Sequence, residues 1–441
     1  MRKAALHNLG CKVNAYETEA MQELLEKNGY QIVPFQDEAD IYIINTCSVT
    51  NIADRKSRQM IHRARKQNPD AVIVAAGCYV QARTDAGEKD ENIDIVIGNN
   101  KKQELIGILD AYFAQKEKHQ QIEVIDINHT AKYEELSLTR TAEHTRAYLK
   151  VQDGCNQFCT YCIIPYARGR VRSRKKEEVV REVETLAANG YREVVLTGIH
   201  LSSYGVDLKD ENGKQQEDLL SLIRAVHEVE GIVRIRLGSL EPRIITEEFA
   251  SELSKLKKIC PHFHLSLQSG CNATLKRMNR RYSAEEYYEK CRILRKYFDN
   301  PALTTDVITG FPGETEEDFL ETMDVVKQVE YDSAFTFIYS KRTGTPAAAK
   351  EEQVPEEIVK DRFDRLLQVV QKIGAEKAET LTGTRQKVLV EDVNAQDEQL
   401  VTGRLSNNSV VHIRGGKELI GQIVEVTLDE CRGFYYMGTL V

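Results

Sequence analysis

Six of the ten cysteines fall into two groups of three whose spacing is typical of metal ligands. The tight group is Cys155, Cys159 and Cys162, and the dispersed group is Cys11, Cys47 and Cys78. Iron–sulfur cubanes normally take four thiolates. Three thiolates leave one iron with an open position that can bind a substrate or a reagent. The pattern therefore predicts a catalyst with two reactive clusters rather than a ferredoxin.

Zinc is the alternative for the tight group. Structural zinc usually takes four protein ligands, and three cysteines leave the fourth unassigned. His144 lies eleven residues before Cys155, which is not a familiar zinc-finger spacing, whereas His200 could approach in the folded chain. For the dispersed group the alternative is three unrelated buried thiols, because a single buried cysteine is common.

The elements of residues 1–114 must position the dispersed group. Strand and helix patterns alternate there, which predicts a doubly wound parallel sheet. The expected strands are 3–8, 41–45, 71–75 and 93–97, and the expected helices are 14–28 and 54–67. Each dispersed cysteine comes just past the carboxyl end of an apolar run, on the edge where open α/β sheets bind ligands. We therefore expect the fold to bring the three thiols together.

A second alternation of strands and helices occupies 141–371, after a strand-containing connector at 115–140. The expected strands are 148–152, 193–196, 233–237, 262–267, 303–308 and 334–339, and the expected helices are 177–189, 219–229, 284–297, 316–329 and 356–379. This pattern predicts a partial (β/α)6 barrel with its active site at the carboxyl ends of the strands. Cys155 directly follows the first strand, so the tight group belongs to that rim.

Residues 374–441 change to a period of two, with glycines between short apolar segments. This pattern predicts a small antiparallel β-barrel. The fold class is therefore α/β with three parts: the parallel sheet, the partial barrel and the terminal β-barrel.

The three-cysteine loop after the first barrel strand resembles the signature of the radical S-adenosylmethionine (SAM) superfamily. The resemblance implies that the open iron of a 4Fe–4S cluster chelates SAM, which one electron then cleaves to a 5′-deoxyadenosyl radical. Other rim segments match this family, and each has a second interpretation as a turn glycine or an ordinary cap. The implied SAM-binding residues are Gly198, Ser239, Glu241, Ser266, Gln268, Asp306 and Gly310.

The whole chain resembles the methylthiotransferase family, in the order cluster domain, radical SAM core and TRAM barrel. The match lies in Leu-Gly-Cys-Lys-Val-Asn at 9–14, Asn-Thr-Cys-Ser-Val-Thr at 45–50, Gly-Cys-Tyr-Val-Gln at 77–81 and the run from 154 to 174. The resemblance implies two 4Fe–4S clusters, one on each cysteine group. It also implies that the dispersed group holds the sulfur that becomes a methylthio group on an unactivated carbon.

Three substrate branches of this family compete. The Gly-Cys-Lys-Val-Asn segment resembles the branch that acts on adenine carbon 2 of threonylcarbamoyladenosine beside the tRNA anticodon. The isopentenyladenosine branch more often has Gly-Cys-Gln-Met-Asn there, and a third branch modifies an aspartate of a ribosomal protein. A non-enzymatic iron–sulfur protein that binds RNA or transfers electrons is the alternative outside the family chemistry.

The formal net charge of −8 gives no global signal for nucleic acid, so RNA contacts must come from local patches. One candidate is the basic helix at 54–67, although a solvated helix face explains it equally well. The RNA-binding candidates elsewhere are Arg168, Arg170, Arg172 and Arg174 beside the tight group, and Arg404, Arg414 and Lys417 in the terminal barrel. Lys and Arg neutralise phosphates, so we expect salt-dependent RNA binding.

Composition sets the expected setting of the protein. No signal-peptide pattern opens the sequence and no apolar run approaches the ~20 residues needed to span a bilayer. Ten cysteines without a secretory pattern indicate metal ligands and buried thiols rather than disulfides. We expect a cytoplasmic monomer with no membrane contact, a tRNA substrate and a reducing electron donor as partners.

Overall fold

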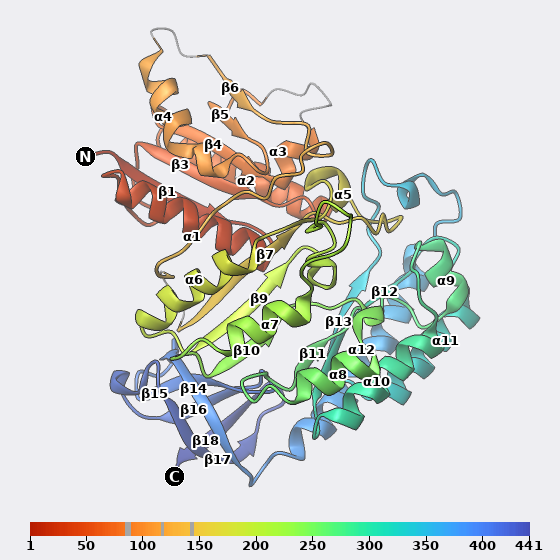
Figure 1. The fold of residues 1–441 in the computed structure, drawn as a ribbon. Helices are drawn as coiled ribbons and strands as arrows, with labels where there is room; N and C mark the ends of the chain where they lie inside the picture. Colours follow the sequence, from red (N-terminus) through yellow and green to blue (C-terminus); the bar gives the residue numbers. More distant parts are fainter. Residues whose placement is uncertain (84–89, 116–118, 142–144) are drawn as a thin grey trace.

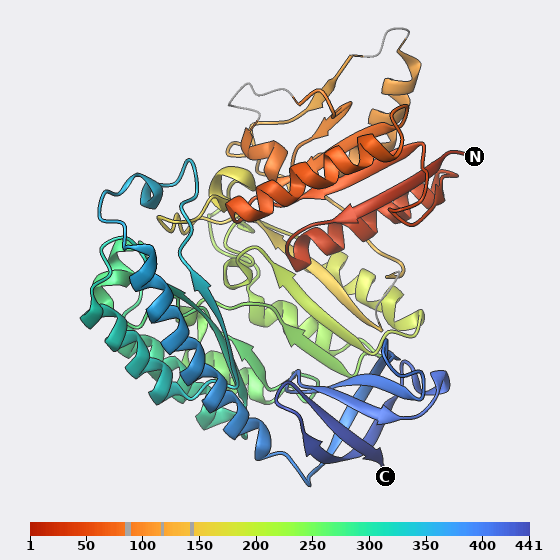
Figure 2. The same cartoon turned by 180° about the vertical axis from the view of Figure 1, so that it is seen from behind.

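The computed structural model describes residues 1–83, 90–115, 119–141 and 145–441. Three parts lie in a row, with the N-terminal sheet at one end, the partial barrel in the middle and the closed C-terminal barrel at the other end (Figures 1 and 2). This arrangement confirms the fold class predicted from the sequence. In the described part of the chain, no helix combines the length and apolar character needed to cross a membrane.

The N-terminal sheet has six parallel strands in the order β2-β1-β3-β4-β5-β6. Their bounds are β1 Lys3–Asn8, β2 Gln31–Ile32, β3 Ile41–Thr46, β4 Val72–Gly77, β5 Ile95–Ile97 and β6 Gln121–Glu123. The buried apolar runs of β3 and β4 form the centre of the sheet, as parallel strands covered on both faces require. β6 belongs to this sheet, although the sequence placed it in the connector.

Helices cover both faces of this sheet. α1 (Lys12–Lys27) and α4 (Leu105–Ala114) pack on one face, and α2 (Asn51–Gln67) and α3 (Cys78–Arg83) pack on the other. The η2 turn (Lys102–Glu104) leads into α4. α1 starts directly after Cys11 and α3 starts at Cys78, so these cysteines lie where strands turn into helices.

The middle part is a partial barrel of six parallel strands with one short antiparallel strand at its edge. The barrel strands are β7 Arg146–Asp153, β9 Glu193–Gly198, β10 Arg234–Leu237, β11 His262–His264, β12 Ala302–Thr309 and β13 Ser333–Ile338, and the edge strand is β8 Arg172–Ser173. Parallel bridges at Ile235–Ile259 and Leu240–Leu265 join the β10 side to the β11 side. The strands therefore follow one continuous curve from β7 to β13 (Figure 1).

Helices surround the outside of this curve and bury the main apolar core. They are α6 Lys176–Ala188, α7 Leu219–His227, α8 Glu247–Ser254, α9 Asn272–Arg277, α10 Ala284–Tyr297, α11 Glu316–Val329 and α12 Glu356–Glu379. The short α5 (Ile164–Ala167) instead follows the tight cysteine group and lies next to α3. Short 3-10 turns η3 (Leu201–Ser203), η4 (Pro242–Ile244) and η5 (Pro346–Ala349) follow strand ends. Capping boxes begin α7, α10 and α11, which explains why these starts were visible in the sequence.

The C-terminal part is a closed barrel in the order β14-β15-β16-β18-β17. Its strands are β14 Arg385–Val393, β15 Leu400–Leu405, β16 Val410–Arg414, β17 Ile423–Cys431 and β18 Tyr435–Leu440, with η6 at Lys417–Leu419. Its pairs are antiparallel except β16 with β18, which are parallel.

Arginines of β10 hold this small barrel against the amino ends of the larger barrel's strands. Arg234 donates to the carbonyls of Arg404 (2.9 Å) and Lys387 (2.6 Å). Arg236 donates to the carbonyls of Ser406 (2.8 Å) and Leu405 (3.2 Å). The C-terminal barrel therefore closes the end of the middle barrel that lies opposite the cysteine loop.

Candidate cluster sites and active site

The tight cysteine group occupies the loop between β7 and α5, at the carboxyl ends of the barrel strands. The backbone N–H of Cys155 donates to the carbonyl of Gly169 (3.0 Å), which closes the base of the loop. Gly154 must be glycine, because it has φ +71° and a Cβ there would lie 1.8 Å from the carbonyl oxygen of Arg170. The loop is thus fixed at both of its ends.

The turn after α9 supports the outer part of this loop. The N–H of Thr160 donates to the carbonyl of Met278 (3.0 Å), and the side-chain amide of Asn279 donates to the carbonyl of Phe158 (2.9 Å). Arg280 then donates from Nη1 to Sγ of Cys159 (3.3 Å). No spacing pattern indicates this arginine, because it lies 121 residues from the cysteine that it contacts.

The dispersed cysteines follow β1, β3 and β4, and the sheet brings their loops together. A Cβ at Gly10 would lie 2.7 Å from Sγ of Cys47, so the Cys11 loop packs directly on the Cys47 side chain. The Asn14 amide links the same loops by donating to the carbonyls of Leu9 (2.7 Å) and Thr46 (3.0 Å). The expected gathering of the three loops at one sheet edge is therefore present.

Burial holds the thiols of Cys47, Cys155 and Cys162 in their neutral form. Burial, together with the neighbouring thiols Cys78 and Cys11, raises the pKa of Cys47 to about 11. Burial also raises the pKa of Cys155 to about 11 and that of Cys162 to about 12. Metal binding must therefore release protons from these thiols, as it does wherever a thiolate is the ligand.

Arg168 connects the dispersed group to the barrel domain. It follows α5, is fully buried, and donates from Nε to Sγ of Cys78 (3.3 Å). Its Nη1 and Nη2 atoms donate to the carboxylate of Glu17 (2.8 and 3.0 Å), Nη1 also donates to Asp153 (3.1 Å), and Nη2 donates to Asn14 Oδ1 (2.6 Å). Arg168 of the barrel loop thus contacts Cys78, Asn14 and Glu17 of the N-terminal domain, as well as the last residue of β7.

Buried lysines complete this charge network. Lys102 and Lys150 contact the two oxygens of Glu17 at 2.9 and 2.7 Å. Burial alone would raise the pKa of Glu17, but Arg168, Lys102 and Lys150 hold it well below its usual range. The carboxylate therefore stays charged, as a buried ion must when it is paired on several sides.

A second anchor holds the N-terminal domain over the barrel mouth. Arg342, in the loop after β13, donates to Asp54 Oδ2 (2.6 Å), Asn51 Oδ1 (2.9 Å) and Ser48 Oγ (2.5 Å). Ser48 directly follows Cys47 in the chain. The Cys47 loop is therefore tied to the barrel rim, and the Cys78 loop is tied to it by Arg168.

The predicted SAM-binding residues lie along the barrel rim with different surroundings. Ser239 is exposed and Ser266 is half-buried, whereas Glu241 caps η4 and pairs with Arg243 (2.8 Å). Gln268 has φ +67° and donates its N–H to the carbonyl of Asp306 (2.8 Å). These five rim positions remain predictions as cofactor contacts.

The two rim glycines also pack closely on neighbouring elements. A Cβ at Gly198 would lie 2.9 Å from the Gln152 side chain, and a Cβ at Gly310, which has φ +73°, would lie 2.5 Å from Val359 of α12. Both positions therefore require glycine for packing, and their contact with SAM stays a prediction.

His200 is a rim residue with an unused nitrogen. Its Nδ1 contacts Ser203 Oγ (2.7 Å), while its Nε2 is buried and has no hydrogen-bond partner. Burial, with Arg280 and Arg243 nearby, lowers the pKa of His200 to about 4, so the ring is neutral at neutral pH. Because buried polar atoms are normally hydrogen-bonded, this nitrogen is a candidate contact for a polar ligand group.

The residues fit an iron–sulfur cluster better than zinc. Among the described residues, no three His, Cys, Asp or Glu side chains form a group that could hold one metal ion. Zinc needs each sulfur within about 2.3 Å. His144, one candidate fourth ligand, lies outside the described residues. A three-thiol set with an arginine donor at one sulfur fits the larger, negatively charged cubane, whose sulfurs accept hydrogen bonds.

The structure corrects most of the RNA-binding candidates. Arg168, Arg172 and Arg174 are buried, and they pair with Glu17, Asp153 and Glu182 respectively, so they have no surface to offer a phosphate. Arg404 pairs with Glu391 (3.1 Å) at the contact with the middle barrel. The candidates that remain exposed are Arg170, Arg414 and Lys417.

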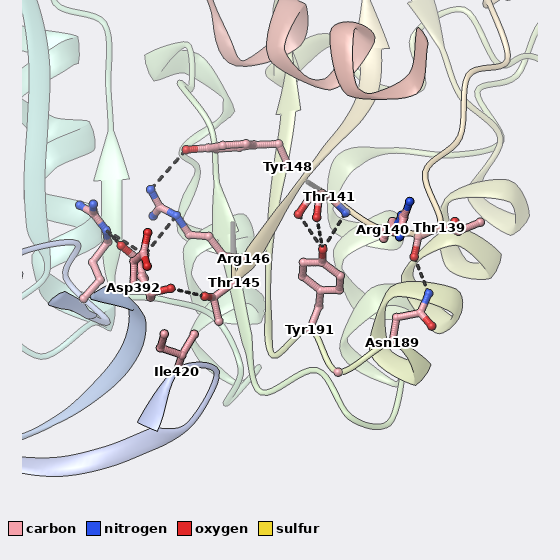
Figure 3. A pocket seen from close by; sticks show the side chains of 13 residues that line it. Thr139, Arg140, Thr141, Thr145, Arg146, Tyr148, Asn189, Tyr191, Asp392 and Ile420 are labelled. Carbon is pink, nitrogen blue, oxygen red and sulfur yellow. Dashed lines mark hydrogen bonds and ion pairs between the residues drawn. The ribbon is translucent and has the colours of Figure 1, made fainter. Parts of the chain in front are cut away.

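A hollow between the connector, the start of β7 and the C-terminal barrel has no cysteine among its lining residues (Figure 3). In it the Tyr191 hydroxyl contacts Thr141, and Arg146 donates to the Tyr148 hydroxyl (3.3 Å). This hollow contains none of the predicted cofactor residues, so we do not assign the active site to it.

Family models match each of the three parts. Residues 3–98 match "Uncharacterized protein family UPF0004", residues 149–326 match "Radical SAM superfamily", and residues 379–441 match "TRAM domain". The fold and the thiol loop at the barrel rim thus define a radical SAM enzyme. The 4Fe–4S and SAM cofactors expected from the sequence are those of this class.

Curated relatives match over the whole length. A threonylcarbamoyladenosine tRNA methylthiotransferase (MtaB) of Bacillus subtilis is 42% identical, with 100% of this chain and 97% of the relative covered. A tRNA-2-methylthio-N(6)-dimethylallyladenosine synthase of Lachnoclostridium phytofermentans is 41% identical, with 99% and 95% covered. The chain belongs to the radical SAM tRNA methylthiotransferase family.

Solved structures agree on the fold. The radical SAM methyltransferase TsrM of Kitasatospora setae, with cobalamin and a [4Fe-4S] cluster bound, has a TM-score of 0.56 at 15% identity and covers 88% of this chain and 80% of its own. The cobalamin-dependent radical enzyme OxsB has a TM-score of 0.51 at 14% identity, with 84% and 56% covered. Both likenesses concern the fold alone.

Proposed function

We propose that this enzyme installs a methylthio group on adenine carbon 2 of threonylcarbamoyladenosine beside the anticodon of tRNA. The observation that carries the proposal is the Leu9–Asn14 segment of the thiol loop, Leu-Gly-Cys-Lys-Val-Asn, taken with the full-length likeness to the Bacillus subtilis enzyme. The second candidate substrate is dimethylallyladenosine in tRNA, which the 41% identical synthase favours.

In this proposal each thiol group holds one 4Fe–4S cluster. Cys155, Cys159 and Cys162 hold the cluster that presents SAM, and Cys11, Cys47 and Cys78 hold the cluster that presents the sulfur to be transferred. The bound cofactors supply the radical and the methylthio group. Arg280 and Arg168 support this assignment, because each donates a hydrogen bond to one sulfur of a group.

Residues of the barrel rim are proposed to bind SAM, and exposed basic side chains are proposed to bind tRNA. Asp306, Gln268 and the unused His200 nitrogen are proposed to contact SAM. Arg170, Arg414, Lys417 and the exposed residues Arg55 and Lys56 of α2 are proposed to contact tRNA phosphates. With tRNA as its substrate we expect a cytoplasmic monomer that receives electrons from a separate reductant.

Nucleoside mass spectrometry of tRNA tests the substrate. A strain that lacks the protein should lose the methylthio form of threonylcarbamoyladenosine and accumulate the unmodified nucleoside. Complementation with the wild-type chain should restore it, and complementation with a Cys155→Ala variant should not. Loss of a methylthio form of dimethylallyladenosine instead would establish the second candidate.

A further inference from the structure

The interior of the middle barrel carries two phenylalanines that are open to solvent. On β12, Leu303 and Val307 face the outer helices, so Thr304, Asp306 and Ile308 face the interior. Phe335 and Phe337 of β13 stand beside Asp306 and Ile308 in the parallel register, and so share the interior face. They are 56% and 49% exposed, which is unusual for large apolar side chains inside a barrel.

Polar groups surround this apolar surface. The ring of His264, on β11, lies 5.8 Å from the Phe335 ring, and its Nε2 contacts Asp306 Oδ2 (3.1 Å). A surface with an aromatic face and a few fixed polar groups beside it suits a planar base, because stacking on an aromatic ring is worth about 1–3 kcal/mol per base.

A lysine enters the same interior from the other side. Lys12 is the first residue of α1, next to Cys11, and its ammonium lies 5.8 Å from the centre of the Tyr148 ring. Tyr148 and Arg146 are on the face of β7 opposite Ala147 and Leu149, which pack on the outer helices. The Lys12 side chain thus extends into the barrel from the wall that faces β13.

The other cations near Lys12 have carboxylate partners. Arg146 and Arg404 both contact Glu391 (3.3 and 3.1 Å), and Arg236 contacts Glu193 (2.8 Å). Lys12 makes no hydrogen bond or ion pair within the described part of the chain. An unpaired ammonium close to Arg146, Arg236 and Arg404 is suited to bind an anion.

We propose that the barrel interior holds the substrate adenosine against Phe335 and Phe337, and that the Lys12 ammonium binds a carboxylate on its N6 substituent. This inference rests on the proposed function, because the threonylcarbamoyl group carries a carboxylate and the dimethylallyl group does not. An apolar substituent would leave the ammonium unpaired in the closed complex, which disfavours that substrate. Lys12 is then a specificity residue, separate from the cluster ligands.

The test uses three anticodon stem-loop RNAs, with threonylcarbamoyladenosine, its neutral carboxamide analogue or dimethylallyladenosine. Wild type, Lys12→Gln and Lys12→Arg are compared with Lys257→Gln, a change at an exposed lysine outside the barrel interior. RNA affinity is measured by fluorescence anisotropy without SAM, and kcat/KM is measured with it. Iron content confirms that the neighbouring Cys11 still carries its cluster.

We expect Lys12→Gln to weaken binding and kcat/KM for the carboxylate RNA about 10- to 100-fold, since hydrogen bonds to charged groups contribute that much. The affinity of Lys12→Gln for the carboxamide RNA should stay within about twofold of wild type. Lys12→Arg should retain most of the wild-type affinity for the carboxylate RNA, and Lys257→Gln should match wild type with every RNA. Phe335→Ala should weaken all three RNAs about tenfold, as the loss of a stacking surface would.

Two outcomes separate the inference from the proposed function. Suppose that wild type modifies the carboxylate RNA. If Lys12→Gln then lowers affinity equally for the carboxylate and carboxamide RNAs, or changes affinity for neither, the role of Lys12 is overturned while the proposed function stands. If wild type modifies the dimethylallyladenosine RNA and not the carboxylate RNA, the proposed function fails and the inference falls with it.

Discussion

Replacing Arg168 by methionine would remove a fully buried cation and leave its anionic partners in place. The side chain contacts Glu17 at 2.8 Å, Asp153 at 3.1 Å and Sγ of Cys78 at 3.3 Å. Methionine has a similar length and no charge, so the change tests the charge rather than the volume. Glu17 would then keep Lys102 and Lys150 as partners, and Asp153 would keep Lys150 and Arg172.

Breaking a buried ion pair by removing one partner costs about 3–5 kcal/mol, because the other charge stays buried without compensation. Two lysines remain beside Glu17, so we expect the lower end, about 3 kcal/mol of lost unfolding free energy. Urea denaturation of the metal-free protein, followed by circular dichroism, would measure it. Arg170→Met is the matched control. The Arg170 side chain is exposed and lies over the Phe158 ring, so its replacement should lower the unfolding free energy by less than about 1 kcal/mol.

The same variant should change the dispersed-group cluster. Loss of the donor to Cys78 removes a hydrogen bond and a positive charge from that cluster, which lowers its reduction potential because the reduced form is more negative. Arg168→Lys should retain more of the potential than Arg168→Met. Two results together would refute the view that Arg168 joins the two domains. The unfolding free energy of Arg168→Met would lie within about 1 kcal/mol of that of the Arg170→Met control, and the reduction potential of the dispersed-group cluster would be unchanged.

Three further results are expected. Anaerobically reconstituted wild type should contain about eight irons, and Cys11→Ala and Cys155→Ala about four each; full iron in either variant would contradict the ligand assignment. Arg280→Gln should lower the potential of the cluster on the tight group, measured by redox titration, and an unchanged potential would count against its contact with Cys159. In the metal-free protein the pKa of His200 is lowered to about 4, so its contribution to stability is present above pH 6.5 and is lost as the pH falls toward 4. The difference in stability between wild type and His200→Gln should therefore shrink by at most about 3 kcal/mol over that range, and a constant difference would refute the buried neutral ring.

Much of the fold followed from periodicity. The apolar runs that became β3 and β4 are buried along their whole length, so their type and position were evident from residue types. The sheet topology then placed the three dispersed cysteines on one edge without any signal from their spacing. Chain order and the carboxyl-edge rule were enough for that part of the site.

The sequence did not indicate which charged side chains point into the protein and which point to solvent. Arg168 and Arg170 are two residues apart and have the same charge, yet one is fully buried and the other is exposed. A count of basic residues treats them alike, which is why the RNA prediction failed at Arg168. The burial of Arg168 could have been inferred from its partner Glu17, which lies on the buried face of α1 with Val13 and Ala20. A carboxylate on an apolar helix face requires a buried cation.

The two arginine–sulfur contacts show why the cluster environments depend on the assembled chain. Arg280 reaches the tight group from the turn after α9, and Arg168 reaches the dispersed group from a different domain. An isolated N-terminal domain would have its three thiols, but it would lack the cation at Cys78 and would leave Glu17 without its strongest partner. Its cluster would be held in a more negative surrounding than in the whole protein. The potential of the dispersed-group cluster is therefore a property of domain docking, and a change at the barrel loop reaches a cluster in the N-terminal sheet through a single side chain.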